Sequence, residues 1–305
     1  MRPSFPSARV PGRRRRPRLV ALQALPTLVT LGNVVAGFLA MSYAVDAASA
    51  PDASLRETLW LKAAWAVGFG MLCDMLDGFV ARLTGAASSF GAELDSLADM
   101  VTFGAAPALL AKSVVQTTFP TLSPKLATAL ALVYLLGAAL RLARYNVESN
   151  RVQEPGHRTV VFRGLPSPGA AGVIASLILF RNEFAQEHWA WLGWAFLAGA
   201  PVLGLLMVSR FGYPHLVNRF LSGARPPLVL LLLPVLVYLA WQHLEAAMAA
   251  IFCGYMASGP ALWVVRAIVG RPRWAEDEDD DEDEDRPVDD ASLVVPGDAD
   301  EVPRS

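Results

Sequence analysis

Long apolar runs separated by short charged segments constrain this fold more than any other feature of the chain. About eight such runs occur between residues 25 and 268, and several approach the roughly 20 residues that a helix needs to cross a bilayer. Only 18% of the residues are charged, against about 25% in a typical soluble domain. The sequence therefore predicts an all-α, polytopic membrane helical bundle of about eight transmembrane helices. The predicted spans cover about residues 25–45, 58–79, 94–115, 125–143, 168–180, 189–208, 226–242 and 246–268.

The charges divide the chain into a basic front, an apolar middle and an acidic end. Residues 1–24 read as a basic disordered leader, and residues 271–305 as an acidic disordered tail because Glu276–Asp285 are all acidic and repel one another. Between them we expect a membrane core over residues 25–210 and two additional transmembrane helices over residues 211–270. The net charge of −2 averages two opposite ends, and we expect no nucleic-acid partner.

Arginine placement predicts the orientation of the bundle. In polytopic membrane proteins, Lys and Arg accumulate in the cytoplasmic loops. If the N-terminus is cytoplasmic, an even number of spans returns the C-terminus to the same side, and most arginines then lie there. We therefore expect both termini in the cytoplasm, a multi-pass protein of the cell membrane, and an active site that faces the cytoplasm. The loops on the other side would hold only Arg56, Lys62, Lys112, Lys125 and Arg181 in or near them.

Four aspartates at the junction of two apolar segments are the main candidate for chemistry. Asp74 and Asp77 are three residues apart, and Asp95 and Asp99 are four apart, so on helices each pair shares one face. Carboxylates between membrane-spanning segments are costly to bury unless a cation neutralises them. Aspartate oxygens suit Mg²⁺, Mn²⁺ or Ca²⁺, and Mg²⁺ commonly links carboxylates to substrate phosphates. The pattern predicts a divalent metal site.

The same stretch reads Asp-x2-Asp-Gly-x2-Ala-Arg-x8-Gly-x3-Asp-x3-Asp and resembles the signature of the CDP-alcohol phosphatidyltransferase family. The resemblance implies transfer of a phosphatidyl group from a CDP-linked lipid, with Mg²⁺ or Mn²⁺ as cofactor. It assigns Asp74, Asp77 and Asp95 to the metal, and Asp99 to the general base and a second metal. It also implies contacts with the cytidine diphosphate from Gly78, Ala81, Arg82 and Gly91.

Four further segments are similar to the branch of this family that uses serine as acceptor: Leu25–Asn33, Ser96–Pro107, Arg141–Asn146 and Phe162–Pro168. The resemblance implies CDP-diacylglycerol and L-serine as substrates, in contact with membrane lipid, and a homodimer. Three arginines could hold the serine carboxylate or a lipid phosphate, since arginine binds both with two hydrogen bonds. They could equally be anchors at the cytoplasmic surface: Arg141, Arg144 and Arg163.

Two alternatives stay open from the sequence. The same scaffold could use another acceptor, such as glycerol 3-phosphate or inositol phosphate, for which more basic residues would be expected around the acceptor site. The aspartates could instead line the ion path of a transporter. Many transporters are built from repeated halves with broken helices, and no internal repeat is evident in this sequence.

Overall fold

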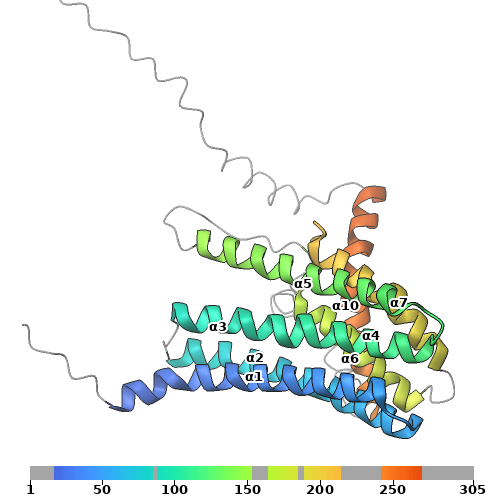
Figure 1. Ribbon diagram of the computed structural model, residues 1–305. Helices are drawn as coiled ribbons and strands as arrows, with labels where there is room; N and C mark the ends of the chain where they lie inside the picture. The colour runs from blue at the N-terminus through green and yellow to red at the C-terminus, as the bar shows by residue number, and fades with distance from the viewer. Residues whose placement is uncertain (1–16, 85–87, 153–163, 185–188, 214–241, 270–305) are drawn as a thin grey trace, which may run out of the picture. The chain divides into compact units, whose positions relative to one another are not determined.

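The computed structural model describes residues 17–84, 88–152, 164–184, 189–213 and 242–269, and the regular elements in these residues are all helices (Figure 1). This confirms the all-α prediction for the described part of the chain. The elements are α1 (Pro17–Ser49), α2 (Ala53–Thr84), α3 (Ser89–Asp99), the π-helix η1 (Met100–Ala105), α4 (Ala106–Thr118), α5 (Pro124–Val152), α6 (Ser167–Phe184), α7 (Trp189–Val208) and α10 (Leu244–Val269).

Six stretches of these helices are long and apolar enough to cross a membrane. They lie in α1, α2, the continuous α3–η1–α4 segment, α5, α7 and α10. Helix α6, which has 18 residues, falls outside this set. The predicted span at residues 226–242 lies almost wholly outside the described residues. The chain thus has the helices of a multi-pass membrane protein, and the count of eight remains a prediction.

Two helix ends lie furthest from the predicted boundaries. Helix α1 begins at Pro17, inside the segment assigned to the basic leader, while the rest of that leader and the acidic tail lie outside the described residues. Helix α5 continues to Val152, past its predicted end near residue 143. Arg141 and Arg144 therefore lie within a continuing helix and not at its inner end.

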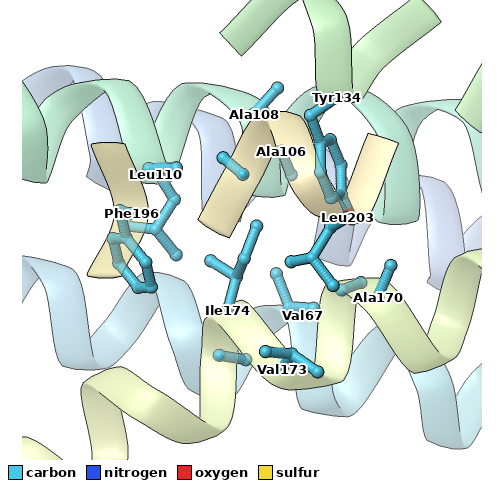
Figure 2. Packing of buried hydrophobic residues seen from close by; sticks show 14 of the residues in the cluster. Val67, Ala106, Ala108, Leu110, Tyr134, Ala170, Val173, Ile174, Phe196 and Leu203 are labelled. Atoms are coloured by element: carbon cyan, nitrogen blue, oxygen red, sulfur yellow. The ribbon is translucent and has the colours of Figure 1, made fainter. Parts of the chain in front are cut away.

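Residues up to Ala261 form one unit, and its core is built where small side chains let helices approach closely. Helix α1 packs along α2 through a row of buried alanines, Ala36, Ala40, Ala44 and Ala47, at helical spacing. Small residues are the usual contact in membrane bundles, because burial of apolar surface drives little association within lipid. Larger side chains from α2, α4, α5, α6 and α7 fill the centre (Figure 2).

Helices α5 and α7 meet through a pair of glycines. A Cβ atom built on Gly137 would lie 2.7 Å from the Cα atom of Gly204, and one on Gly204 would lie 2.8 Å from the Cα atom of Tyr134. Both separations are too short for real side-chain contacts, so the two backbones touch directly. This contact sets the distance between α7 and the helix that carries Arg141.

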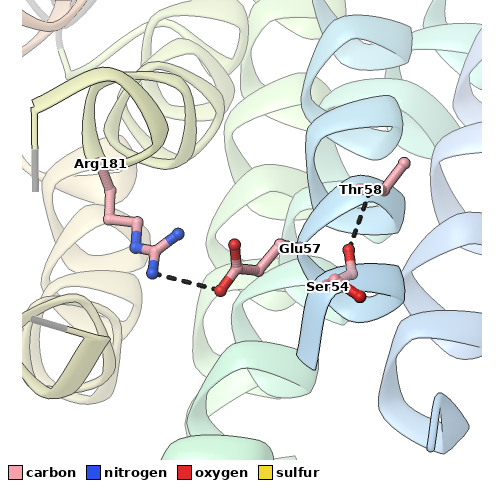
Figure 3. A network of polar contacts seen from close by, with 4 residues as sticks. All are labelled: Ser54, Glu57, Thr58 and Arg181. Carbon is pink, nitrogen blue, oxygen red and sulfur yellow. Dashed lines mark hydrogen bonds and ion pairs between the residues drawn. The ribbon is translucent and has the colours of Figure 1, made fainter. Parts of the chain in front are cut away.

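Arg181 was expected in or beside an outer loop, and its side of the membrane remains a prediction. It lies in the last turn of α6, its side chain is 1% exposed, and its Nη2 atom donates to Oε1 of Glu57 over 3.4 Å (Figure 3). The pairing explains the burial, because a charged side chain can leave water only with an opposite charge beside it. The pair joins the end of α6 to the start of α2.

Candidate metal and substrate site

Three of the four predicted aspartates converge. Asp74 comes from α2, and Asp95 and Asp99 come from α3, one helical turn apart. One carboxylate oxygen of each lies within 4.8 Å of the other two, and all three side chains are half-buried. Three carboxylate oxygens at this separation can share one divalent cation. The structure thus brings together three of the four aspartates whose helical spacing had predicted shared helix faces.

Asp77 lies outside this group of three but beside it. Its side chain is 5% exposed, and its charge is near enough to repel those of Asp74 and Asp95. Its Oδ2 atom, like Oδ1 of Asp95, is buried and has no hydrogen-bond partner within the described residues. Buried anionic oxygens without donors are costly unless a cation neutralises them, so this donor set fits a divalent metal. Asp77 as a direct ligand remains a prediction.

The helix that carries Asp95 and Asp99 changes its winding immediately after Asp99. Residues Met100–Ala105 form a π-helix, an uncommon element that is frequent at functional sites. Inside it, Thr102 is fully buried, and its Oγ1 atom donates to the main-chain oxygen of Asn33 over 2.8 Å. A Cβ atom on Gly37 would lie 2.8 Å from the Cα atom of Thr102, which leaves no room for a larger residue on α1.

Asn33 of α1 also contacts the acidic cluster directly. It is fully buried, and its Nδ2 atom donates to Oδ1 of Asp99 over 3.3 Å. From the sequence, Asn33 was only the last residue of the Leu25–Asn33 segment and had no predicted role. The available signal was an amide side chain inside an apolar run, since polar residues at membrane depth are usually functional.

Arg141 lies near the aspartates, and its role as an acceptor-binding residue stays a prediction. Its guanidinium is near enough to Asp99 and Asp74 for their opposite charges to attract, and its Nη1 atom donates to Oγ of Ser167 over 2.9 Å. Ser167 belongs to the predicted Phe162–Pro168 segment, so α5 and the start of α6 meet beside the aspartates. Arg144 instead is exposed and donates to the main-chain oxygen of Val208 over 3.4 Å, and Arg163 lies outside the described residues.

The segment that holds Ser167 is fixed by its backbone. Gly164 has φ of +89°, and its N–H donates to the main-chain oxygen of Phe211 over 2.9 Å, while Leu165 donates to that of Leu206 over 3.1 Å. A Cβ atom on Gly164 would lie 3.0 Å from the main-chain oxygen of Ser209, so both the positive φ and the close approach require glycine. The α6 start is thereby anchored to the end of α7.

The four residues expected to contact cytidine diphosphate lie around the turn between α2 and α3. A Cβ atom on Gly78 would meet nothing within 4 Å, so the space beside it is open. Ala81 is half-buried and Arg82 is exposed in the last turn of α2. The N–H of Gly91 donates to Oγ of Ser88, which caps the start of α3, over 3.0 Å. Their contacts with a nucleotide stay predictions.

A cavity of about 160 Å³ lies at the far end of α2, about 25 Å along the helix from Asp74. It is lined by Arg56, Glu57 and Trp60 among others. Arg56 donates to the main-chain oxygen of Ala50 over 3.0 Å, Glu57 pairs with Arg181, and Trp60 donates to Oγ of Ser113 over 3.0 Å. These three side chains already have hydrogen-bond or ion-pair partners, so the aspartate cluster is the stronger candidate for the functional site.

Comparison with known proteins agrees with this site. The family model for CDP-alcohol phosphatidyltransferase matches residues 23–202, which include every aspartate of the cluster. Three similar proteins all bear the name CDP-diacylglycerol–serine O-phosphatidyltransferase. The one from Helicobacter pylori is 33% identical over 64% of this chain and 73% of its own length. The one from Mycobacterium tuberculosis is 32% identical over 65% of this chain and 63% of its own length. The one from Bacillus subtilis is 32% identical over 63% of this chain and 90% of its own length.

These matches decide between the enzyme and the transporter that the sequence had left open. The matched region contains the complete motif from Asp74 to Asp99, and the structure gathers its carboxylates at one place. The chain therefore belongs to the CDP-alcohol phosphatidyltransferase family and is an enzyme of phospholipid synthesis.

Proposed function

We propose that this enzyme transfers the phosphatidyl group from CDP-diacylglycerol to the hydroxyl of L-serine, forming phosphatidylserine and CMP. The observation that carries the proposal is the position of Arg141 beside the cluster of Asp74, Asp95 and Asp99. The guanidinium of Arg141 next to the reaction site suits an acceptor that carries a carboxylate. The names of the three similar proteins support serine as that acceptor.

The proposed cofactor is Mg²⁺ or Mn²⁺, held by Asp74, Asp77 and Asp95, with Asp99 contributing to a second metal. When bound, the metal would neutralise the diphosphate of the lipid substrate and stabilise the phosphate of the departing CMP. The carboxylates otherwise face one another at membrane depth, where repulsion between like charges is strong. Metal binding by these residues therefore also stabilises the helix junction.

Asp99 is the proposed general base. It accepts the proton of the serine hydroxyl as the serine oxygen attacks the phosphorus that carries the diacylglycerol. A bond forms between that oxygen and the phosphorus, and the bond from the phosphorus to the oxygen bridging to CMP breaks. Asp99 serves in this role because it is held one turn beyond Asp95 and close to Arg141. A carboxylate is a weak base, and its fixed position next to the serine hydroxyl compensates for this weakness.

The remaining proposed contacts divide between the two substrates. Gly78, Ala81, Arg82 and Gly91 would contact the cytidine diphosphate, with open space beside Gly78 to admit it. Arg141 would bind the serine carboxylate, supported by its hydrogen bond to Ser167. The structure gives Arg144 a weaker case, because it is exposed and engages the end of α7. Arg163 stays in the proposal on sequence grounds alone.

The orientation completes the proposal. Eight spans with both termini in the cytoplasm would place the aspartate cluster at the cytoplasmic side of the cell membrane. CDP-linked lipids present their nucleotide to that side, and free serine is dissolved there. A homodimer is proposed from family resemblance.

Membranes containing the enzyme test the acceptor. CMP release is measured with CDP-diacylglycerol and Mg²⁺, with and without serine, glycerol 3-phosphate or inositol phosphate, and the lipid product is identified. We expect CMP release that requires serine and stops in excess chelator. If a phosphorylated acceptor supports CMP release and serine does not, that acceptor is the substrate in place of serine. The phosphatidyl transfer typical of the family would still hold.

A further inference from the structure

Asn33 occupies an unusual position for a side chain that the chemistry has not yet used. It is fully buried in α1. Its side-chain Nδ2 donates to Asp99, and its main-chain oxygen accepts a hydrogen bond from Thr102. Its Oδ1 atom is buried and has no hydrogen-bond partner within the described residues. A buried amide with an unmet acceptor is costly for stability. A role in fold stability alone explains it poorly.

The surroundings hold this amide in place. A Cβ atom on Gly70 would lie 2.9 Å from Oδ1 of Asn33, so α2 passes directly over the side chain. On the other side, the bond from Thr102 ties the Asn33 backbone to the π-helix that follows Asp99. Three rigid elements, α1, α2 and η1, thus fix the amide opposite one oxygen of Asp99.

We propose that Asn33 is a positioning residue for Asp99. By donating to Oδ1, the amide holds the carboxylate in one orientation and leaves Oδ2 directed to the acceptor hydroxyl. This inference rests on the proposed role of Asp99 as base, and it does not depend on which alcohol is the acceptor.

The substitution Asn33→Ala removes the donor and keeps the main-chain bond to Thr102, because that bond uses a backbone oxygen. We expect kcat to fall about 10- to 100-fold, the size usual for a residue that orients a reactive group. The KM for the acceptor and the Kd for CDP-diacylglycerol should change less than about threefold. Asn33→Leu, which suits the apolar surroundings better, repeats the measurement if the alanine variant does not insert.

Ser113→Ala is the matched control. Ser113 is buried in α4, and the change removes one buried side-chain hydrogen bond, from Trp60, far from the aspartates. Thermal unfolding in detergent compares the two variants. We expect similar losses of stability but a large loss of kcat only at Asn33. Equal kcat for Asn33→Ala and the wild type would overturn the proposal.

A double-mutant cycle with Asp99→Asn separates positioning from a general structural role. If Asn33 acts through Asp99, adding Asn33→Ala to Asp99→Asn should lower the residual single-turnover rate less than about twofold. A drop as large as in the wild-type background, or a tenfold weaker binding of CDP-diacylglycerol by Asn33→Ala alone, refutes the proposal. The acceptor that the wild-type enzyme uses is determined before the variants are measured. A failure of serine as the acceptor is therefore distinguished from a failure of Asn33 as a positioning residue.

Discussion

Replacing Gly137 with alanine tests whether the direct backbone contact between α5 and α7 shapes the site. The new Cβ atom would lie 2.7 Å from the Cα atom of Gly204, against 3.4–4 Å for ordinary van der Waals contact. The two helices would have to separate locally by roughly 0.7 Å or more, the difference between these distances. Gly137 lies one turn before Arg141 on α5, so the displacement reaches the proposed carboxylate-binding residue.

The expected cost follows from two opposing effects. Overpacking of a close contact usually costs about 1–3 kcal/mol. Replacing glycine with alanine in a helix also gains about 1 kcal/mol of helix propensity. The same gain applies at a helix position where the new Cβ atom meets no neighbour. Gly199 on α7 is such a position, because a Cβ atom there would meet nothing within 4 Å. The propensity gain cancels in the comparison, so Gly137→Ala should be about 1–3 kcal/mol less stable than Gly199→Ala.

Thermal unfolding of the two purified variants in the same detergent measures this difference. At about 2–4 °C per kcal/mol, Gly137→Ala should have an apparent Tm at least about 2 °C below that of Gly199→Ala. Gly204→Ala should resemble Gly137→Ala, since its Cβ atom would meet the α5 backbone in the reciprocal contact. Equal Tm values for Gly137→Ala and Gly199→Ala would show that the helices do not touch at this point.

Three further predictions concern the site and its orientation. Asp99→Asn should reduce turnover to a small residual rate yet keep CDP-diacylglycerol binding within about tenfold, or roughly 1.4 kcal/mol, whereas Asp77→Asn should weaken binding itself. Titration of both purified variants in Mg²⁺ compares them, and equal losses of binding would make Asp99 a metal ligand first. Arg141→Lys should raise the KM for serine at least about tenfold and change the Kd for CDP-diacylglycerol little, because lysine cannot form the paired hydrogen bonds of a guanidinium. An unchanged KM for serine would show that Arg141 does not bind the acceptor. A cysteine at Ser49 should react with a membrane-impermeant reagent on intact cells and one at Ser149 should not, and the opposite result would reverse the proposed orientation.

Local features of the sequence predicted much of this molecule. Apolar run length determines where a chain can cross a bilayer, and it located the helices of the described residues to within several residues at most ends. Helical spacing also predicted that Asp95 and Asp99 share one face, because three- and four-residue separations are neighbours on any α-helix. The motif was complete in the sequence, and family membership followed from it.

Contacts between distant segments could not be predicted in this way. Asn33 and Asp99 are 66 residues apart, and only the packing of α1 against α3 and η1 brings the amide to the carboxylate. The burial of Arg181 could not be predicted either, because it depends on the ion pair with Glu57, which forms only where α6 meets α2. Periodicity specifies which face of a helix a residue occupies, while the neighbour on that face depends on the packing of all the helices together. The carboxylates were readable from the sequence, and the residue that orients one of them emerged only from the tertiary structure.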